Sequence, residues 1–239
     1  MSKQVLLLLP GLLCDATVWT HQRSALSAIA DTVVPEYGSL DSISAMADKV
    51  LQEAPAQTFA LAGHSMGGRV ALEVVRKAPS RVARLALLDS GFEPIAEGEA
   101  GEQERAKRMR LLEIAKTQSM RAMGQQWAPG MVHPDCVNTP LFEEILDMIE
   151  RRTPAQFEAQ INALLGRPDA APVLASLRCP TLLVCGRQDA WSPYARHELM
   201  HQMIPAPWSR LKAVEDCGHM STMERPDAVS ALLAQWLLN

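Results

Sequence analysis

Hydrophobic residues along this chain occur mainly in short continuous runs that return at intervals. Such runs, bounded by turn residues, are typical of strands that are buried on both faces. Helical patterns lie between the runs, and this alternation favours an α/β protein with a mostly parallel sheet covered on both faces. We expect about six strands, at residues 5–9, 32–34, 59–62, 84–88, 181–185 and, with a weaker pattern, 208–214.

Apolar residues at helical spacing predict the helices that cover this sheet. One stripe begins behind a cap at Asp41 or Ser42, and another begins at Pro226 in the last helix. Each stripe is wide enough to bury one face of a helix. The first contains Ile43, Met46, Ala47, Val50 and Leu51, and the second Val229, Leu232, Leu233, Trp236 and Leu237.

The alternation stops between residues 92 and 178, where we find no convincing strand pattern. Helical patterns follow one another there, at 102–127, 140–151, 154–165 and 169–177. The apolar side of the first pattern either faces a substrate or packs against other helices. It contains Met109, Leu112, Met120, Met123 and Trp127. We expect a core formed by residues 1–91 and 179–239, with a small helical cap at 92–178 inserted after the fourth strand.

Composition excludes several classes of protein. A chain of 239 residues suits one α/β domain with an insertion, and a net charge of -4 gives no basic surface for nucleic acid. No apolar stretch reaches the roughly 18 residues that a membrane span needs. Five cysteines without a CxxC pair argue against a disulfide framework or a zinc site, and they fit buried thiols in a reducing compartment. We expect a soluble cytoplasmic protein with no nucleic-acid or membrane partner.

The segment LLLLPGLLCD at residues 6–15 has two interpretations. Lys3, the apolar run and Cys14 together resemble a bacterial lipoprotein signal, which would be removed before the cysteine. Alternatively, the run is a buried strand and PGLLCD is the loop at its end. We favour the strand, because Leu13 stands where such a signal requires a small residue.

A glycine-rich turn after the third strand supplies a candidate nucleophile. Gly63, Ser65 and Gly67 match the pattern GxSxG between a short apolar run and a helix that ends near Pro79. Small flanking residues let the strand and the helix approach each other closely around a strained central residue. Ser65 would therefore project above the carboxyl end of the sheet, where open α/β sheets bind their ligands.

A serine hydroxyl needs a base, and histidine is the most effective base near neutral pH. His219 lies in the loop between the last strand and the last helix, which also belongs at the carboxyl end of the sheet. We assign His64 to shaping the serine turn. His197 and His201 are one helical turn apart, and we interpret them as part of a solvated helix face.

The base in turn needs a carboxylate that fixes its tautomer. Asp189 follows the fifth strand and is the first choice, because the chain order Ser65, Asp189, His219 is the one found in nucleophile-elbow hydrolases. Asp89 after the fourth strand and Asp216 remain alternatives.

These motifs resemble those of the α/β-hydrolase superfamily. The matching segments are the strand and loop at the start, GHSMGG, GRQD and GHMSTMERP. The resemblance implies a doubly wound sheet with a cap after Leu88, and it assigns the backbone N–H groups of Leu12 and Met66 to an oxyanion hole. Many relatives have His-Gly in the first loop, whereas this chain has Pro10 before Gly11, so the loop must be held differently.

The predicted chemistry is acyl transfer to water, because a serine nucleophile excludes mechanisms that require a carboxylate at this turn. We expect hydrolysis of small, largely apolar carboxylic esters, as in small bacterial carboxylesterases, with no cofactor and no metal. Trp191, Met220 and Trp127 are expected to line the pocket together with Leu12 and Met66.

Other reactions on the same triad remain open. They are cleavage of a lactone, a thioester or a carbon–carbon bond, and the elimination catalysed by a menaquinone-pathway synthase. Arg69 suggests the last of these, although we favour a structural role in which it bridges to another element. A ligand receptor on this fold is a further alternative, because some members retain the triad without turnover.

Overall fold

The computed structural model describes residues 3–239, which contain one six-stranded sheet. Every neighbouring pair of strands is parallel, in the order β2-β1-β3-β4-β5-β6. The bounds are β1 (Gln4–Leu9), β2 (Ala30–Val33), β3 (Phe59–His64), β4 (Val82–Leu88), β5 (Thr181–Gly186) and β6 (Ser209–Val214). The predicted α/β class and the six expected strands are confirmed.

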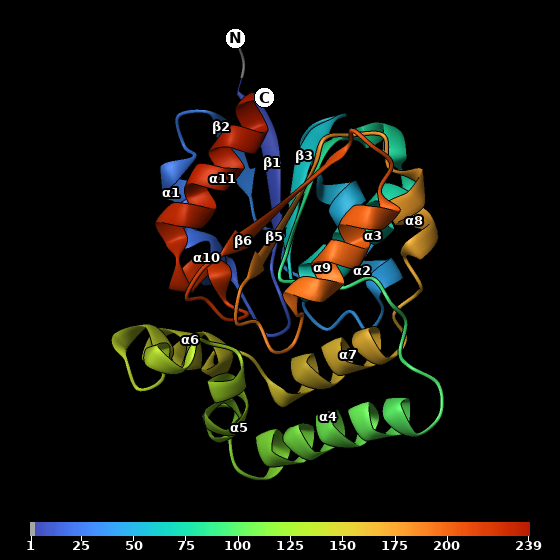
Figure 1. Ribbon diagram of the computed structural model, residues 1–239. Helices are drawn as coiled ribbons and strands as arrows, with labels where there is room; N and C mark the ends of the chain where they lie inside the picture. The colour runs from blue at the N-terminus through green and yellow to red at the C-terminus, as the bar shows by residue number, and fades with distance from the viewer. Residues whose placement is uncertain (1–2) are drawn as a thin grey trace.

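Helices cover both faces of the sheet (Figure 1). On one side lie α1 (Thr20–Ala25), α10 (Ser221–Glu224) and α11 (Pro226–Leu238). On the other side lie α2 (Ile43–Glu53), α3 (Met66–Lys77), α8 (Ala171–Ser176) and α9 (Tyr194–Met203). The sheet is therefore doubly wound, and its strands all end at the same edge.

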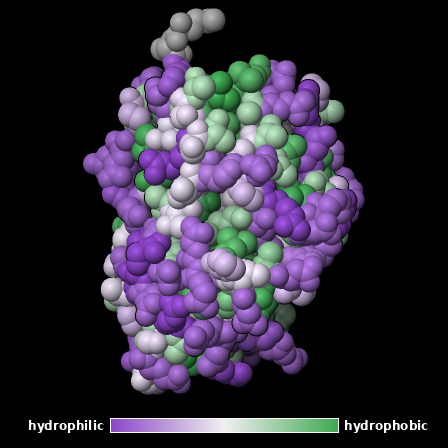
Figure 2. All heavy atoms as spheres, turned by 90° about the vertical axis from the view of Figure 1, so that its left-hand side faces the viewer, coloured by the Kyte–Doolittle hydropathy of each residue, from purple (hydrophilic) through white to green (hydrophobic). Residues whose placement is uncertain are grey.

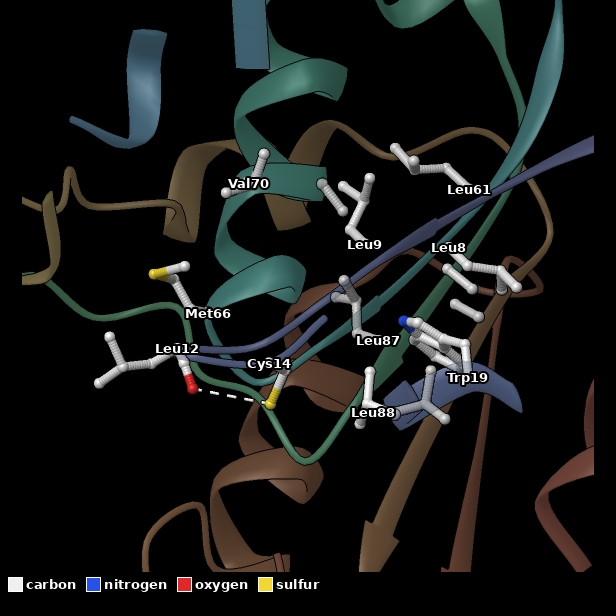
Figure 3. Packing of buried hydrophobic residues seen from close by; sticks show 14 of the residues in the cluster. Leu8, Leu9, Leu12, Cys14, Trp19, Leu61, Met66, Val70, Leu87 and Leu88 are labelled. Atoms are coloured by element: carbon white, nitrogen blue, oxygen red, sulfur yellow. Dashed lines mark hydrogen bonds between the residues drawn. The ribbon is translucent and has the colours of Figure 1, made fainter. Parts of the chain in front are cut away.

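The central strands are mainly apolar because both of their faces are covered over most of their length. Leu8, Leu61 and Leu87 come from three neighbouring strands, and each is fully buried in the core (Figure 3). Complete burial of one such side chain contributes about 1.5–3 kcal/mol. β6 lies at the edge and alternates between half-buried and exposed residues, which explains its weaker sequence pattern.

The first helical stripe begins at Ser42 rather than at Asp41. The Ser42 hydroxyl accepts a hydrogen bond from the backbone N–H of Ala45 at 3.1 Å, and this contact caps α2. Four of the five predicted stripe residues are buried, namely Ile43, Met46, Ala47 and Val50.

Four helices between β4 and β5 form a separate layer at the carboxyl ends of the strands (Figure 1). They are α4 (Glu99–Thr117), α5 (Met120–Trp127), α6 (Pro140–Glu150) and α7 (Pro154–Leu165). We call these four helices and their connecting loops the helical layer. In contrast, α8 packs against α3 and α9 beside the sheet.

The single helical pattern predicted at 102–127 is two helices in the structure. Ser119 has an extended backbone, and its hydroxyl accepts a hydrogen bond from the N–H of Ala122 at 3.0 Å, so a new helix begins there. The predicted apolar side is also interrupted. Met109 is 37% exposed, whereas Leu112 is buried.

Hydrophilic residues dominate the face shown in Figure 2, where apolar residues reach the surface only in small groups. Within residues 3–239, no helix is both long and apolar enough to cross a membrane. All five cysteines are free thiols.

Candidate active site

Ser65 stands at the sharp turn between β3 and α3. Its φ of 53° lies in the left-handed region, which is unfavourable for a residue with a side chain. The turn is held through both backbone groups of Ser65. The N–H of Ser65 donates to Leu88 O at 2.9 Å, and the carbonyl oxygen of Ser65 accepts from the Ser90 hydroxyl at 2.7 Å. Gly67 is required here, since a Cβ would lie 2.2 Å from the carbonyl oxygen of Leu9.

The structure brings Ser65, His219 and Asp189 into one hydrogen-bonded chain. Ser65 Oγ lies 2.8 Å from His219 Nε2, and His219 Nδ1 lies 2.8 Å from Asp189 Oδ2. The other carboxylate oxygen of Asp189 accepts the backbone N–H groups of Trp191 and Ser192. The aspartate is therefore fixed on one side by its own loop and orients the imidazole with the other.

The charges of Asp189 and His219 favour the protonated form of the His219 imidazole. Burial alone would lower the pKa of His219, but the adjacent Asp189 carboxylate outweighs burial and leaves the pKa raised above its usual value. Burial alone would raise the pKa of Asp189, yet the charge and hydrogen bond of His219 leave it below its usual value. The pair is therefore arranged to stabilise an imidazolium, which is what a base that accepts a proton from Ser65 would require.

The loop that carries His219 is held by groups from three directions. The buried Glu224 carboxylate accepts the N–H groups of Gly218 and Met220 on either side of the histidine, at 3.1 and 3.0 Å. His64 lies 2.8 Å from the carbonyl oxygen of His219 through Nε2. Burial lowers the pKa of His64 to about 4, so this ring is neutral at physiological pH and donates that bond.

A loop of the helical layer supplies the third contact. Met131, between α5 and α6, accepts the backbone N–H of His219 at 2.6 Å. Sequence reasoning placed His219 correctly at the edge of the sheet but missed Glu224, although GHMSTMERP contains it. The feature that could have revealed this role is the position of Glu224 in the sequence. It stands just before the last helix and close enough to the His219 loop to accept its N–H groups.

His197 does not lie on a solvated helix face as predicted. It is fully buried, and its Nε2 accepts the backbone N–H of Ser90 at 3.2 Å, beside the serine turn. Burial lowers its pKa to about 4, so the ring remains neutral. His201, the other member of the pair, is exposed as expected.

Asp89, the main alternative to Asp189, is occupied by a structural task. It is fully buried, with Oδ1 accepting from Gly186 N–H and Oδ2 accepting from both the N–H and the hydroxyl of Ser221. It therefore joins the ends of β4 and β5 to the start of α10. Asp216 is exposed and contacts neither ring nitrogen of His219 among the described residues.

Asp89, Cys185 and Asp189 place potential metal-ligating atoms within 4.8 Å of one another. All four carboxylate oxygens already accept hydrogen bonds from within the chain. Burial raises the pKa of the Cys185 thiol well above its usual value, which disfavours the thiolate that a metal requires. These residues are therefore suited to holding the triad together rather than to binding an ion.

The two residues assigned to the oxyanion hole, Leu12 and Met66, line one cavity together with Ser65. Leu12 and Met66 are both buried, border the same cavity as Ser65, and stand beside the first turn of α3 (Figure 3). Neither N–H donates to an acceptor within residues 3–239. Both are thus free to bind a developing negative charge, and the geometry is compatible with the assignment.

The loop around Leu12 is held by residues of the helical layer. Leu13 has a φ of 61°, and its N–H donates to Gln160 Oε1 in α7 at 2.8 Å. Arg152, just before α7, donates through Nη2 to Cys14 O at 2.9 Å. Within the loop, Cys14 donates its N–H to Gly11 O at 3.1 Å. These contacts explain how a loop that contains Pro10 is held in place, and no sequence motif predicts them.

Comparison with known proteins identifies the family. The family model described as "Alpha/beta hydrolase family" matches residues 6–232. The chain belongs to the α/β-hydrolase family.

Relatives of this α/β hydrolase have differing names. This chain is 26% identical over 227 residues to the 2-hydroxy-6-oxononadienedioate/2-hydroxy-6-oxononatrienedioate hydrolase of Escherichia coli. The match covers 87% of this chain and 72% of that protein. A thermophilic esterase from Thermogutta terrifontis, solved with malate bound, is 28% identical at a TM-score of 0.88, covering 99% and 90% of the two chains. The enol-lactonase from Burkholderia xenovorans LB400 is 19% identical at a TM-score of 0.86, covering 100% and 93%.

A cavity of about 960 Å³ opens beside the triad of this α/β hydrolase. Trp191 and Trp127 both line it, with their rings stacked at 5.1 Å, and Trp191 also lies 5.2 Å from the ring of His219. Met220 differs from the prediction, because it is fully buried behind the base and does not line this cavity among the described residues. The reason is that Met220, the residue just before α10, packs within the hydrophobic core.

The apolar lining predicted from the sequence describes only one end of the cavity. Toward α4 and α9 the walls carry charged side chains, among them Arg69, Glu93, Glu104, Arg167 and Arg196. These residues come from five separate parts of the chain, so no single sequence motif marks them.

Proposed function

We propose that the chain is a serine hydrolase that cleaves carboxylic esters of small substrates through an acyl-enzyme. The observation that carries this proposal is the continuous chain of 2.8 Å contacts from Ser65 through His219 to Asp189 beside a cavity. Two unoccupied N–H donors, at Leu12 and Met66, border the same cavity.

The first half of the reaction forms the acyl-enzyme. Ser65 Oγ attacks the ester carbonyl while its proton passes to His219 Nε2, which lies 2.8 Å away. The carbonyl oxygen becomes an oxyanion and accepts from Leu12 and Met66, each such donor typically contributing about 10²- to 10³-fold in rate. The imidazolium then donates the same proton to the alcohol oxygen as the bond to carbon breaks, and the alcohol leaves.

The second half repeats these steps with water. His219 removes a proton from water, the hydroxide attacks the acyl carbonyl, and the proton returns to Ser65 as the carboxylic acid leaves. Each proton that His219 accepts is given back, so the enzyme ends unchanged and needs no cofactor. The stacked rings of Trp127 and Trp191 give the apolar part of a substrate a surface close to His219.

Hydrolysis of an oxo-dioate is the second candidate, favoured by the name of the curated relative from Escherichia coli. The same three side chains serve this reaction, because cleavage of a carbon–carbon bond next to a ketone also passes through an oxyanion. Esters remain the first choice, since attack by Ser65 followed by loss of an alcohol needs nothing beyond the observed contacts.

A chain-length series of p-nitrophenyl esters, assayed with the wild type and Ser65→Ala, tests the proposal. We expect hydrolysis by the wild type, loss of at least about 10³-fold in Ser65→Ala, and a covalent adduct of a fluorophosphonate on Ser65 by mass spectrometry. Hydrolysis that persists in Ser65→Ala would show that another group is the nucleophile. A labelled Ser65 without turnover of any ester would support the oxo-dioate reaction instead.

A further inference from the structure

Arg69 is a cation without a carboxylate partner at the charged end of the active-site cavity. It lies four residues after Ser65, in the first turn of α3, and both residues border the same cavity. Arg69 Nη1 donates to the backbone carbonyl of Glu93 at 2.7 Å. No ion pair of Arg69 is found among residues 3–239.

The carboxylates around Arg69 are already paired with other arginines. Glu104 Oε1 forms ion pairs with Arg108 Nη2 at 2.8 Å and with Arg167 Nη1 at 2.7 Å. Glu93 Oε2 forms an ion pair with Arg196 Nε at 3.1 Å. Among the arginines that line this end, Arg69 is therefore the one whose positive charge has no carboxylate partner within residues 3–239.

Positive charge exceeds negative charge over this end of the cavity. Five basic residues line it there against three glutamates. The basic residues are Arg69, Lys107, Arg108, Arg167 and Arg196, and the glutamates are Glu93, Glu97 and Glu104. Arg69 is half-buried, and withdrawing a cation from water is costly unless an anion accompanies it, so this end is suited to a negatively charged group.

The chain makes room for the guanidinium. A Cβ on Gly91 would lie 2.8 Å from Arg69 Nη2 and 3.2 Å from Arg196 Cδ, so a larger residue would displace both arginines. Burial, together with the neighbouring cations Arg167 and Arg196, lowers the pKa of Arg69 to about 9, and the group still carries its charge at neutral pH.

We propose that Arg69 binds a carboxylate of the substrate, so that the preferred ester carries one acidic group a short carbon chain away from the reacting carbonyl. This inference rests on the proposed serine hydrolase and names its substrate class. Both side chains border one cavity, so a dicarboxylic acid with one carboxyl group esterified can present its ester carbonyl to Ser65 and its free carboxylate to Arg69. The other donors of Arg69 then replace water around the free carboxylate.

The test pairs two substrates with three variants. Mono-p-nitrophenyl esters of dicarboxylic acids with four to seven carbons are compared with the same compounds whose free carboxyl is a methyl ester. We expect the wild type to prefer the charged member by about 10- to 100-fold in kcat/KM, from the usual strength of a charged hydrogen bond. Arg69→Met should lower kcat/KM for the charged ester much more than for the neutral ester and so abolish the preference.

Arg110→Met is the matched control, because Arg110 is exposed on α4 and does not line the cavity among the described residues. It should keep the wild-type preference. Arg69→Lys keeps the charge and should retain part of the preference, which tests the inference even if Arg69→Met folds poorly. A wild type without preference, or an Arg69→Met variant that keeps it, would overturn the inference.

Equilibrium binding of the free dicarboxylates separates this inference from the proposed reaction. If neither ester is hydrolysed but Arg69→Met weakens dicarboxylate binding, the ester reaction is wrong and the anion site stands. If both esters are hydrolysed equally by every variant, the reaction stands and the anion site is wrong.

Discussion

Gln160→Leu tests whether the helical layer holds the oxyanion loop in place. The side chain is buried in α7 and accepts the N–H of Leu13 at 2.8 Å, next to the proposed donor Leu12. Leucine has a similar volume but no acceptor, so the substitution removes the hydrogen bond and little else. Gln160 does not line the cavity among the described residues, so the substrate loses no direct contact.

The expected magnitude follows from the cost of an orphaned donor. A buried N–H without an acceptor costs about 1–3 kcal/mol, and the loop can avoid part of that cost only by moving. Since a complete oxyanion donor contributes about 10²- to 10³-fold, partial displacement should lower kcat by about 10- to 100-fold. KM should change by less than about threefold, because the lost interaction forms mainly in the transition state.

Gln156→Ala on the same helix supplies the control. Gln156 accepts the N–H of Thr153 at 3.0 Å in the capping box of α7, and its loss should cost about 1 kcal/mol without touching the loop. Thermal unfolding should show a lower Tm for both variants, whereas steady-state kinetics should show a lower kcat only for Gln160→Leu. A Gln160→Leu variant with wild-type kcat would refute the proposed support of the loop.

Three further predictions follow from the same contacts. Asp189→Asn should lower kcat by about 10³- to 10⁴-fold, whereas Asp89→Asn should mainly lower Tm; the reverse result would exchange their roles. Since His219 must be neutral to act and its pKa is raised, kcat/KM should fall as pH drops, with a midpoint above that of a free histidine. A flat profile between about pH 5 and 8 would exclude this base. Burial raises the pKa of Cys14 to about 12, so a thiol reagent should leave it unmodified in the native protein while labelling the two half-buried cysteines.

The sheet and the positions of the triad residues could be predicted because both depend on patterns local in sequence. The central strands are mainly apolar runs, and Ser65, Asp189 and His219 each lie at or shortly after the end of a strand. A parallel sheet brings all strand ends to one edge, so short segments far apart in the chain could be placed together without knowing any side-chain contact.

Contacts between the helical layer and the core could not be predicted in this way. Gln160 meets Leu13 across 147 residues, and its helix carries no motif that distinguishes this glutamine from Gln156. His197 was misjudged for a related reason, because the position of a histidine on a helix does not reveal which neighbour will cover it. The orientation of each helix depends on packing against several elements at once, and periodicity records only that one face is apolar.

The helical layer is a structural part of the active site rather than only a cover for it. It contacts the base loop through the carbonyl of Met131, which accepts the N–H of His219, and the oxyanion loop through Gln160 and Arg152. The nucleophile turn, by contrast, is fixed from within the core by Leu88 and Ser90. A displacement of the layer would therefore leave Ser65 in position but release the supports of both groups that act on it. The core positions Ser65, and the alignment of this proposed nucleophile with the proposed base and oxyanion donors depends on contacts with the helical layer.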